Sequence, residues 1–206
     1  MTSKNDFALI VVDMKSTRTY TMRARAESTE ATRRRIIESV VALSEERLSL
    51  EIVLADVADR AGVSVQTVLR HFGSKETLFA ATLEYRRAQV REEWVAPAGD
   101  VAAAVRTITD FCERTGDWML AIMSREHVDD AAAKVVAGGR ELHRKWVTET
   151  FAPEIAGCAD PDALVDLLVV ATDLYTWKLL RRDAGRDQAT TAERMLHLVR
   201  AVLSTS

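Results

Sequence analysis

The sequence predicts an all-α fold, in which a small N-terminal three-helix domain with a helix-turn-helix is followed by a larger helical domain. Apolar residues recur at the spacing that collects them on one helix face, as Leu54, Val57 and Ala61 do. Capping Ser, Thr and Asp residues, together with glycines and prolines, separate these periodic segments. Residues 162–183 are apolar on nearly every side, which is typical of a helix buried between neighbours.

Residues 1–27 precede the helical pattern, and their scattered Ser, Thr, Lys and Asp residues predict a mobile arm. Within this arm, the apolar residues 7–12 are compatible with a short strand or with a docking segment. A first helix is expected to begin after a cap at Ser28 or Thr29. We therefore place the first domain at residues 28–93.

The last helix of this domain is expected over residues 75–93, where it would connect the two domains. Pro97 and Gly99 then interrupt the helical pattern, and Asp100 is suited to cap the next helix. The second, helical domain is placed at residues 100–206.

The composition excludes several classes of protein. The chain has 206 residues and a net charge of −3, which is enough length for a substantial core. No apolar run approaches the roughly 18 residues of a membrane span, so we expect a cytoplasmic protein without a membrane segment. Cys112 and Cys158 lack metal-like spacing and are interpreted as reduced thiols. We expect no metal site and no cofactor.

Charge is unevenly distributed along the chain. Residues 1–91 hold fifteen Lys and Arg against twelve Asp and Glu, whereas residues 92–206 hold thirteen against nineteen. A mildly basic first part and an acidic second part suit a protein that contacts phosphates with one end only.

The stretch from Ala61 to Phe79 predicts two short helices joined by a tight turn. Gly62 is free to adopt a positive φ and end the first helix, and Ser64 offers a hydroxyl to the first amides of the second. The second helix is expected over residues 65–71, with a further capped helix beginning after Ser74. Such a pair matches the motif that presents a recognition helix to the DNA major groove.

These residues resemble the DNA-binding domain of the tetracycline-repressor (TetR) family. The resemblance covers about a quarter of the chain and is carried by the following residues: Ile36, Ile37, Val57, Ala58, Ala61, Gly62, Val63, Ser64, Thr67, His71, Phe72, Ser74, Lys75, Glu76, Leu78 and Phe79. It implies a DNA-binding transcriptional regulator, usually a repressor, that acts on a near-palindromic operator as a homodimer.

The resemblance also implies which residues face DNA. They are Arg33, Arg34, Ser64, Val65, Gln66, Thr67, Leu69, Arg70, His71 and Lys75. Arg33 or Arg34 would contact phosphate, as would Lys75 at the start of a helix, where the backbone amides also favour an anion. A Gln66 amide can make two hydrogen bonds to adenine. Packing or capping is an equal alternative for His71, and a solvated face is the alternative for the arginines.

Several positions depart from the family pattern. Leu69 stands where a phosphate-contacting Tyr is usual, and Gln66 where Gly, Ala or Pro is common. Ser44 replaces a large aromatic residue, Leu48 replaces a frequent Gly, and Val53 replaces a capping Thr. We therefore expect an unusual connection between the first two helices.

In the second domain, helices are expected over residues 101–115 and 118–124, with Gly116 ending the first and Asp117 capping the second. Asp129 or Asp130 should begin another helix, which Gly138 and Gly139 break or end before it resumes over residues 140–151. Pro153, Gly157 and Pro161 mark a loop. One long helix is then expected over residues 162–183, and a last one from Thr190 or Thr191.

In the TetR family the last two long helices build a four-helix bundle with a second subunit. Residues 162–183 and 190–204 fit that role, because a monomer would leave a large apolar surface wet. The resemblance further implies a small, mainly apolar effector. Candidates for its pocket are Phe111, Trp118, Met119, Met123, Trp146 and Tyr175, although apolar residues at helical spacing are also typical of a core.

Two other functions compete with this interpretation. An enzyme would need reactive groups, and His127 beside Glu126, or the pair Asp129 and Asp130, are the available candidates. They are not accompanied by a nucleophile motif, a phosphate loop or metal-ligand spacing, so we predict no catalytic residues. The second alternative is a helical small-molecule or protein interaction module whose DNA recognition is degraded.

Overall fold

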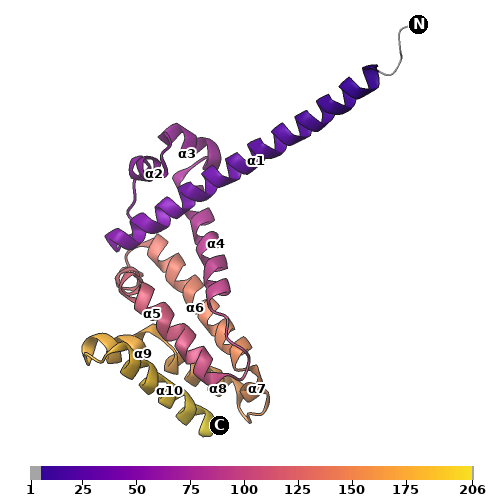
Figure 1. The fold of residues 1–206 in the computed structure, drawn as a ribbon. Helices are drawn as coiled ribbons and strands as arrows, with labels where there is room; N and C mark the ends of the chain where they lie inside the picture. Colours follow the sequence, from indigo (N-terminus) through magenta and orange to yellow (C-terminus); the bar gives the residue numbers. More distant parts are fainter. Residues whose placement is uncertain (1–5, 206) are drawn as a thin grey trace. The chain divides into compact units, whose positions relative to one another are not determined.

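The computed structural model describes the backbone of residues 6–205 and the side chains of residues 26–205. Every regular element in this part of the chain is helical, which confirms the all-α fold (Figure 1). Contacts divide the chain into two compact units. The head unit contains the described residues up to Leu43 and Ile52–Thr82, and the body unit contains Ser44–Glu51 and the described residues from Leu83 onward.

The head unit is built from α1 (Asp6–Arg47) as far as Leu43, α2 (Leu54–Ala61), α3 (Val65–Phe72) and the first part of α4 (Lys75–Glu93). Helix α1 begins at Asp6, so the expected start at Ser28 or Thr29 is wrong and residues 7–12 are helical. The first glycine of the chain is Gly62 and the first proline is Pro97. Nothing before Arg47 therefore interrupts a helix. The mobility of the arm stays a prediction.

The turn between α2 and α3 has the expected form. Gly62 adopts φ 67° and ψ 39°, and its N–H donates to the carbonyls of Ala58 and Asp59. Ser64 caps α3 by accepting a hydrogen bond from the backbone N–H of Thr67 at 3.2 Å. Helix α3 includes Phe72, one residue beyond the predicted end.

Two arginines of α1 join it to the ends of the other helices. Arg33 Nη1 donates to the carbonyl of His71 at 3.2 Å, near the end of α3. Arg35 Nε donates to the carbonyl of Ala61 at 3.5 Å, at the end of α2. Both guanidinium groups meet the negative end of a helix dipole, where a cation is favourable. The same part of α1 carries a buried apolar face, at Ile36, Ile37, Val40 and Leu43.

The body unit contains the rest of α4 and the helices that follow. These are α5 (Val101–Met123), α6 (Asp130–Thr150), α7 (Ala152–Ala156), α8 (Pro161–Ala171), α9 (Leu174–Lys178), the π-helix η1 (Leu179–Asp183) and α10 (Gln188–Ser204). Helix α10 packs against both α5 and α8. Fully buried side chains of the unit's core include Trp177, Phe151, Leu164, Leu168 and Met195.

Two glycine positions in this unit do not end helices, contrary to expectation. Helix α5 continues through Gly116 because Trp177 packs there, and a Cβ at Gly116 would lie 2.5 Å from Cζ3 of that indole. Helix α6 likewise continues through Gly138, where a Cβ would overlap the guanidinium of Arg87. Both glycines therefore allow a close approach between helices. Asp117 consequently caps nothing, whereas Asp129 caps α6 as expected.

The expected continuous helix over residues 162–183 is interrupted. Helix α8 ends at Ala171, and Asp173 begins α9 by accepting a hydrogen bond from Tyr175 N at 2.7 Å. The Thr172 hydroxyl donates to the carbonyl of Leu168 at 2.8 Å. These side-chain hydrogen bonds compete with the helical backbone pattern, so the chain turns here. The final helix begins after Asp187, slightly earlier than predicted.

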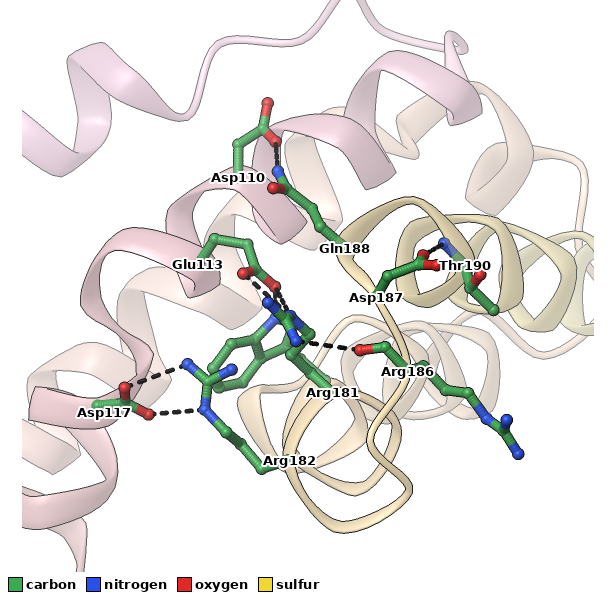
Figure 2. Close-up of polar contacts among 10 residues, drawn as sticks. Asp110, Glu113, Asp117, Arg181, Arg182, Arg186, Asp187, Gln188 and Thr190 are labelled. Atoms are coloured by element: carbon green, nitrogen blue, oxygen red, sulfur yellow. Dashed lines mark hydrogen bonds and ion pairs between the residues drawn. The ribbon is translucent and has the colours of Figure 1, made fainter.

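Figure 2 shows how η1 is held to α5 by side-chain pairs. Glu113 Oε1 accepts hydrogen bonds from Trp177 Nε1 at 2.8 Å and from Arg181 Nε at 2.9 Å. Arg182 contacts Asp117 through two hydrogen bonds of 2.9 and 3.1 Å, and this contact lowers the pKa of the Asp117 carboxyl. The pairing of two successive arginines with α5 keeps Trp177 buried beneath them.

The connection between α1 and α2 departs from ideal geometry, as the sequence predicted. Leu48 adopts φ 49°, a left-handed conformation that is unfavourable for a residue with a Cβ. Val53 occupies the N-cap position of α2 with extended φ and ψ but makes no side-chain cap hydrogen bond. The first amides of α2 therefore lack the hydroxyl partner that a Thr would supply.

We expect Val53→Thr to raise the free energy of unfolding by about 1 kcal/mol, because the new hydroxyl can accept from an amide of the first turn. Denaturation in guanidinium chloride measures the change. The same substitution at Val95, which is also exposed and begins no helix, is the control and should leave stability nearly unchanged. Equal effects at the two positions would contradict the capping argument.

Candidate nucleic-acid interface and ligand cavity

The outer face of α3 carries four of the predicted DNA-contacting residues. Val65, Gln66, Leu69 and Arg70 are all exposed. Ser64 and Thr67 lie at the start of the helix, where their hydroxyl oxygens are 3.0 Å apart. The buried face of the helix is formed by Val68 and Phe72, which leaves two polar side chains, Gln66 and Arg70, and two apolar ones, Val65 and Leu69, outward.

A second part of this surface is the beginning of α4. Ser74 caps the helix by accepting from Thr77 N at 3.1 Å. Lys75 is exposed, and its Nζ lies 5.5 Å from the centre of the Phe79 ring. Lys75 thus adds an exposed cation to the first turn of α4, and a helix N-terminus also favours a phosphate.

The structure distinguishes the two arginines that the sequence left as alternatives. Arg33 is partly buried, donates to the His71 carbonyl and lies with Cζ 4.3 Å above the Phe72 ring. Arg34 is exposed. Arg33 therefore holds α1 to α3, and Arg34 is the better candidate for a phosphate contact. His71 is half-buried, with its ring centre 6.3 Å from that of Phe72.

A separate cavity of about 150 Å³ lies within the body unit. Its lining comes from α4, α5, α6 and residues 172–174, and four of the predicted pocket residues take part, namely Phe111, Trp118, Met119 and Met123. The other two do not line it. Trp146 is buried and donates its indole N–H to the carbonyl of Trp94 at 2.9 Å, and Tyr175 is 48% exposed.

Sequence reasoning missed the polar part of the lining, which includes Arg86, Arg87, Arg140, His143 and Asp173. None of these belongs to a recognisable motif, and only their position on helices that meet at the cavity brings them together. His143 is buried, and its Nε2 lies 2.9 Å from Oγ1 of Thr172. Burial lowers the pKa of the His143 ring, against an opposing effect of the nearby Asp173 carboxylate.

The other candidate reactive groups have structural roles. Burial raises the pKa of the Cys112 thiol to about 12, so it is not a thiolate at neutral pH. Glu126 is paired with Arg140 at 2.8 Å, and the side chain of His127 is 87% exposed. Asp129 accepts hydrogen bonds from Ala131 N and Ala132 N as the cap of α6. Over residues 26–205 no group of three or more His, Cys, Asp or Glu side chains is placed to hold a metal ion.

Residues 53–82 match the model of a protein family described as bacterial regulatory proteins, tetR family. The chain carries a TetR-family helix-turn-helix. The matched segment begins at the N-cap of α2 and ends in α4, so it contains the capped turn, α3 and Lys75. The exposed face of α3 and the start of α4 described above lie within this matched segment.

Solved structures agree with this fold. A transcriptional regulator from Rhodococcus sp. Rha1 superposes with a TM-score of 0.63 at 19% identity, over 84% of this chain and 96% of that chain. A TetR-family protein from Mesorhizobium loti gives 0.63 at 16% identity, over 86% and 97%. A TetR-family regulator from Streptomyces coelicolor gives 0.61 at 22% identity, over 84% and 79%. The comparison with curated proteins gives no match.

The TetR resemblance that the sequence carried is therefore confirmed. The individual DNA-contacting and pocket residues stay predictions. Among the described helices, none is long and apolar enough to cross a membrane.

Arg33→Ala should lower the free energy of unfolding by about 1 to 2 kcal/mol, because it removes a helix-end hydrogen bond and a cation–π contact. Thermal and chemical denaturation measure the loss. Arg34→Ala is the matched control, since it removes an exposed guanidinium one residue away. A loss of stability in Arg34→Ala equal to that in Arg33→Ala would show that the two roles are not separated.

Proposed function

We propose that the protein is a homodimeric, ligand-responsive transcriptional repressor that binds a near-palindromic operator and is released by a small, mainly apolar effector. The observation that carries the proposal is the capped turn between α2 and α3. Gly62 ends the first helix, Ser64 begins the second, and the outer side chains of α3 lie exposed. A second helix presented in this way can enter the major groove.

The side chains of the head unit suggest a division of labour on DNA. Arg34, Arg70 and Lys75 supply exposed cations for phosphates, which position the protein without reading sequence. Gln66 has an amide that can pair with an adenine edge, and Thr67 has a hydroxyl suited to a phosphate or a base. Leu69 offers an apolar contact in place of the hydrogen bond that a Tyr would make.

Dimerisation is supported by apolar side chains that α8, α9, η1 and α10 leave exposed. Val170 and Leu179 are 61% and 60% exposed, and Leu167, Tyr175 and Leu198 are also exposed. A twofold dimer that covers them would present two recognition helices to successive major grooves, about 34 Å apart. The operator would then be a near-palindrome.

Helix α4 gives the effector a route to the head unit. It supplies Lys75 to the DNA-binding surface and Leu83, Arg86, Arg87 and Val90 to the cavity lining. A ligand that binds more tightly when α4 is in one position than in another shifts the equilibrium between the two positions. It thereby changes the fraction of molecules whose head units fit the operator. The protein leaves its operator if the position of α4 that the ligand favours gives head units that fit the DNA less well.

One observation favours a different function. Val65 and Leu69 are apolar and are 37% and 39% exposed on α3. A recognition helix with such a face can bind another protein instead of DNA, as a helical interaction module would.

Selection from a random duplex library at near-physiological salt decides between the two functions. Enrichment of an inverted repeat by the purified protein is the expected result. Binding without enrichment, or no binding by protein freed of any bound ligand, would support the interaction module.

On the selected operator, Lys75→Ala and Gln66→Ala should have different effects. Lys75→Ala should weaken binding to all duplexes and lower the salt dependence by about one counterion, because it removes one phosphate contact. Gln66→Ala should relax preference at one operator position, at a cost of about 1 to 3 kcal/mol on the preferred sequence. Titrations against selected and random duplexes at several salt concentrations measure both effects. Identical behaviour of the two variants would show that their roles are wrongly assigned.

Val170→Glu should convert the dimer to a monomer in sedimentation-velocity experiments, because it places a charge in the proposed apolar interface. Val128→Glu is the control, as Val128 is 83% exposed and lies outside the helices proposed to meet. A dimer that survives Val170→Glu, or a monomeric wild-type protein, would contradict the proposed interface.

A further inference from the structure

The size of the cavity suits a small ligand. At about 150 Å³ its volume is similar to that of an engineered apolar protein cavity that binds benzene. Its walls include the rings of Trp94, Phe111 and Trp118 and the side chain of Met119. The rings of Trp94 and Phe111 meet edge to face, with centres 5.0 Å apart. A single aromatic ring with a small substituent suits this space and these walls.

A hydrogen-bond chain determines the tautomer of His143. The hydroxyl of Thr172 has one proton, which it donates to the carbonyl of Leu168 at 2.8 Å. The same oxygen lies 2.9 Å from His143 Nε2, so it must accept, and Nε2 must carry the hydrogen. In a neutral ring Nδ1 then has a free lone pair, and within the described part of the chain it makes no hydrogen bond.

The neutral form of His143 is favoured by its surroundings. Burial lowers the pKa of the ring, and its neighbours include the indoles of Trp94, at 5.9 Å between ring centres, and Trp146, at 6.0 Å. Beside the carboxylate of Asp173 and the unpartnered indole N–H groups of Trp94 and Trp118, the lining thus presents the Nδ1 acceptor of His143 within a largely aromatic wall. A ligand that fills the cavity must supply a hydrogen-bond donor to use it.

The charged groups of the lining do not call for an ionic ligand. Each arginine has a carboxylate partner outside the lining: Arg86 with Glu45 at 3.5 Å, Arg87 with Glu84 at 2.7 Å, and Arg140 with Glu126 at 2.8 Å. Asp173 adds a negative charge to the lining itself. An anion would meet this carboxylate, and its attraction to the arginines is weakened by their partners.

From this geometry we propose that the cavity binds an uncharged, single-ring hydroxyaromatic compound of the phenol class, whose hydroxyl donates a hydrogen bond to Nδ1 of His143. Thr172 is a positioning residue, since it holds the tautomer that leaves Nδ1 open. The ring of the ligand packs against Trp94, Phe111 and Trp118. An effector role for this compound rests on the proposed function, whereas its binding in the cavity does not.

Calorimetric titration of the full chain with phenol, anisole and benzoate tests the ligand class directly. Phenol should bind at one site, about tenfold or more tightly than anisole, which has the same ring but no hydrogen to donate. Benzoate should also bind more weakly than phenol. Equal affinities for phenol and anisole, or tighter binding of benzoate, would overturn the proposal without any substitution being needed.

Variants of the hydrogen-bond chain test the residues. His143→Phe keeps an aromatic ring and removes the acceptor, so it should abolish the preference for phenol over anisole. His127→Phe makes the same change at an exposed histidine outside the cavity and should leave the preference intact. A preference retained in folded His143→Phe would overturn the assignment of the acceptor.

Thr172→Val should lose the preference, and Thr172→Ser, which keeps the hydroxyl, should restore it. Long-range nitrogen–proton NMR spectra of the ring supply a readout that packing alone would not move. They should show hydrogen on Nε2 in the wild type and in Thr172→Ser, and on Nδ1 in part of the molecules of Thr172→Val. A wild-type ring with hydrogen on Nδ1 would overturn the proposal.

The same titrations separate this inference from the proposed function. Phenol binding that leaves operator affinity unchanged would support the ligand class and contradict only the effector role. A protein that selects an operator but does not bind phenol would overturn the ligand class and leave DNA binding in place.

Discussion

The packing of Trp177 against Gly116 is the contact on which the body unit depends. The indole is fully buried, and it fits only because Gly116 has no side chain. Glu113 orients it through a hydrogen bond to Nε1, and Arg182 covers its outer face with Cζ 4.5 Å from the ring centre. Since α9 and η1 are held to α5 in this way, the segment before them is held as well. That segment contains Thr172, whose hydroxyl sets the tautomer of a cavity histidine.

The head unit follows a different principle, since α2 and α3 are short and their ends need partners. Gly62 closes α2 with a left-handed turn, Ser64 opens α3, and Arg33 and Arg35 bind carbonyls near the ends of α3 and α2. Eight-residue helices are marginal alone, so these contacts and the buried face of α1 keep α3 in place. The polar side chains on the outer face of α3 are consequently presented on a rigid support.

Local signals made much of the fold predictable. A glycine that needs a positive φ and a hydroxyl that caps a helix act over three or four residues, so the bounds of α2 and the starts of α3 and α4 could be read from the chain. The helix stops expected at Gly116 and Gly138 were wrong because a glycine can also serve a contact with a distant side chain. Trp177 and Arg87 lie far along the chain from these glycines, and no local pattern predicts the contacts between them.

By itself, the sequence determined the all-α fold, the capped turn and the family of the helix-turn-helix, because each depends on neighbours along the chain. Tertiary structure decided that Arg33 holds α1 to α3 while Arg34 stays exposed, although the two are adjacent arginines. It also decided which apolar residues line a cavity and which fill a core, and it gave His143 an open acceptor by placing Thr172 beside it. Such roles depend on which side chains meet in space, and helical periodicity predicts only the face on which a residue lies.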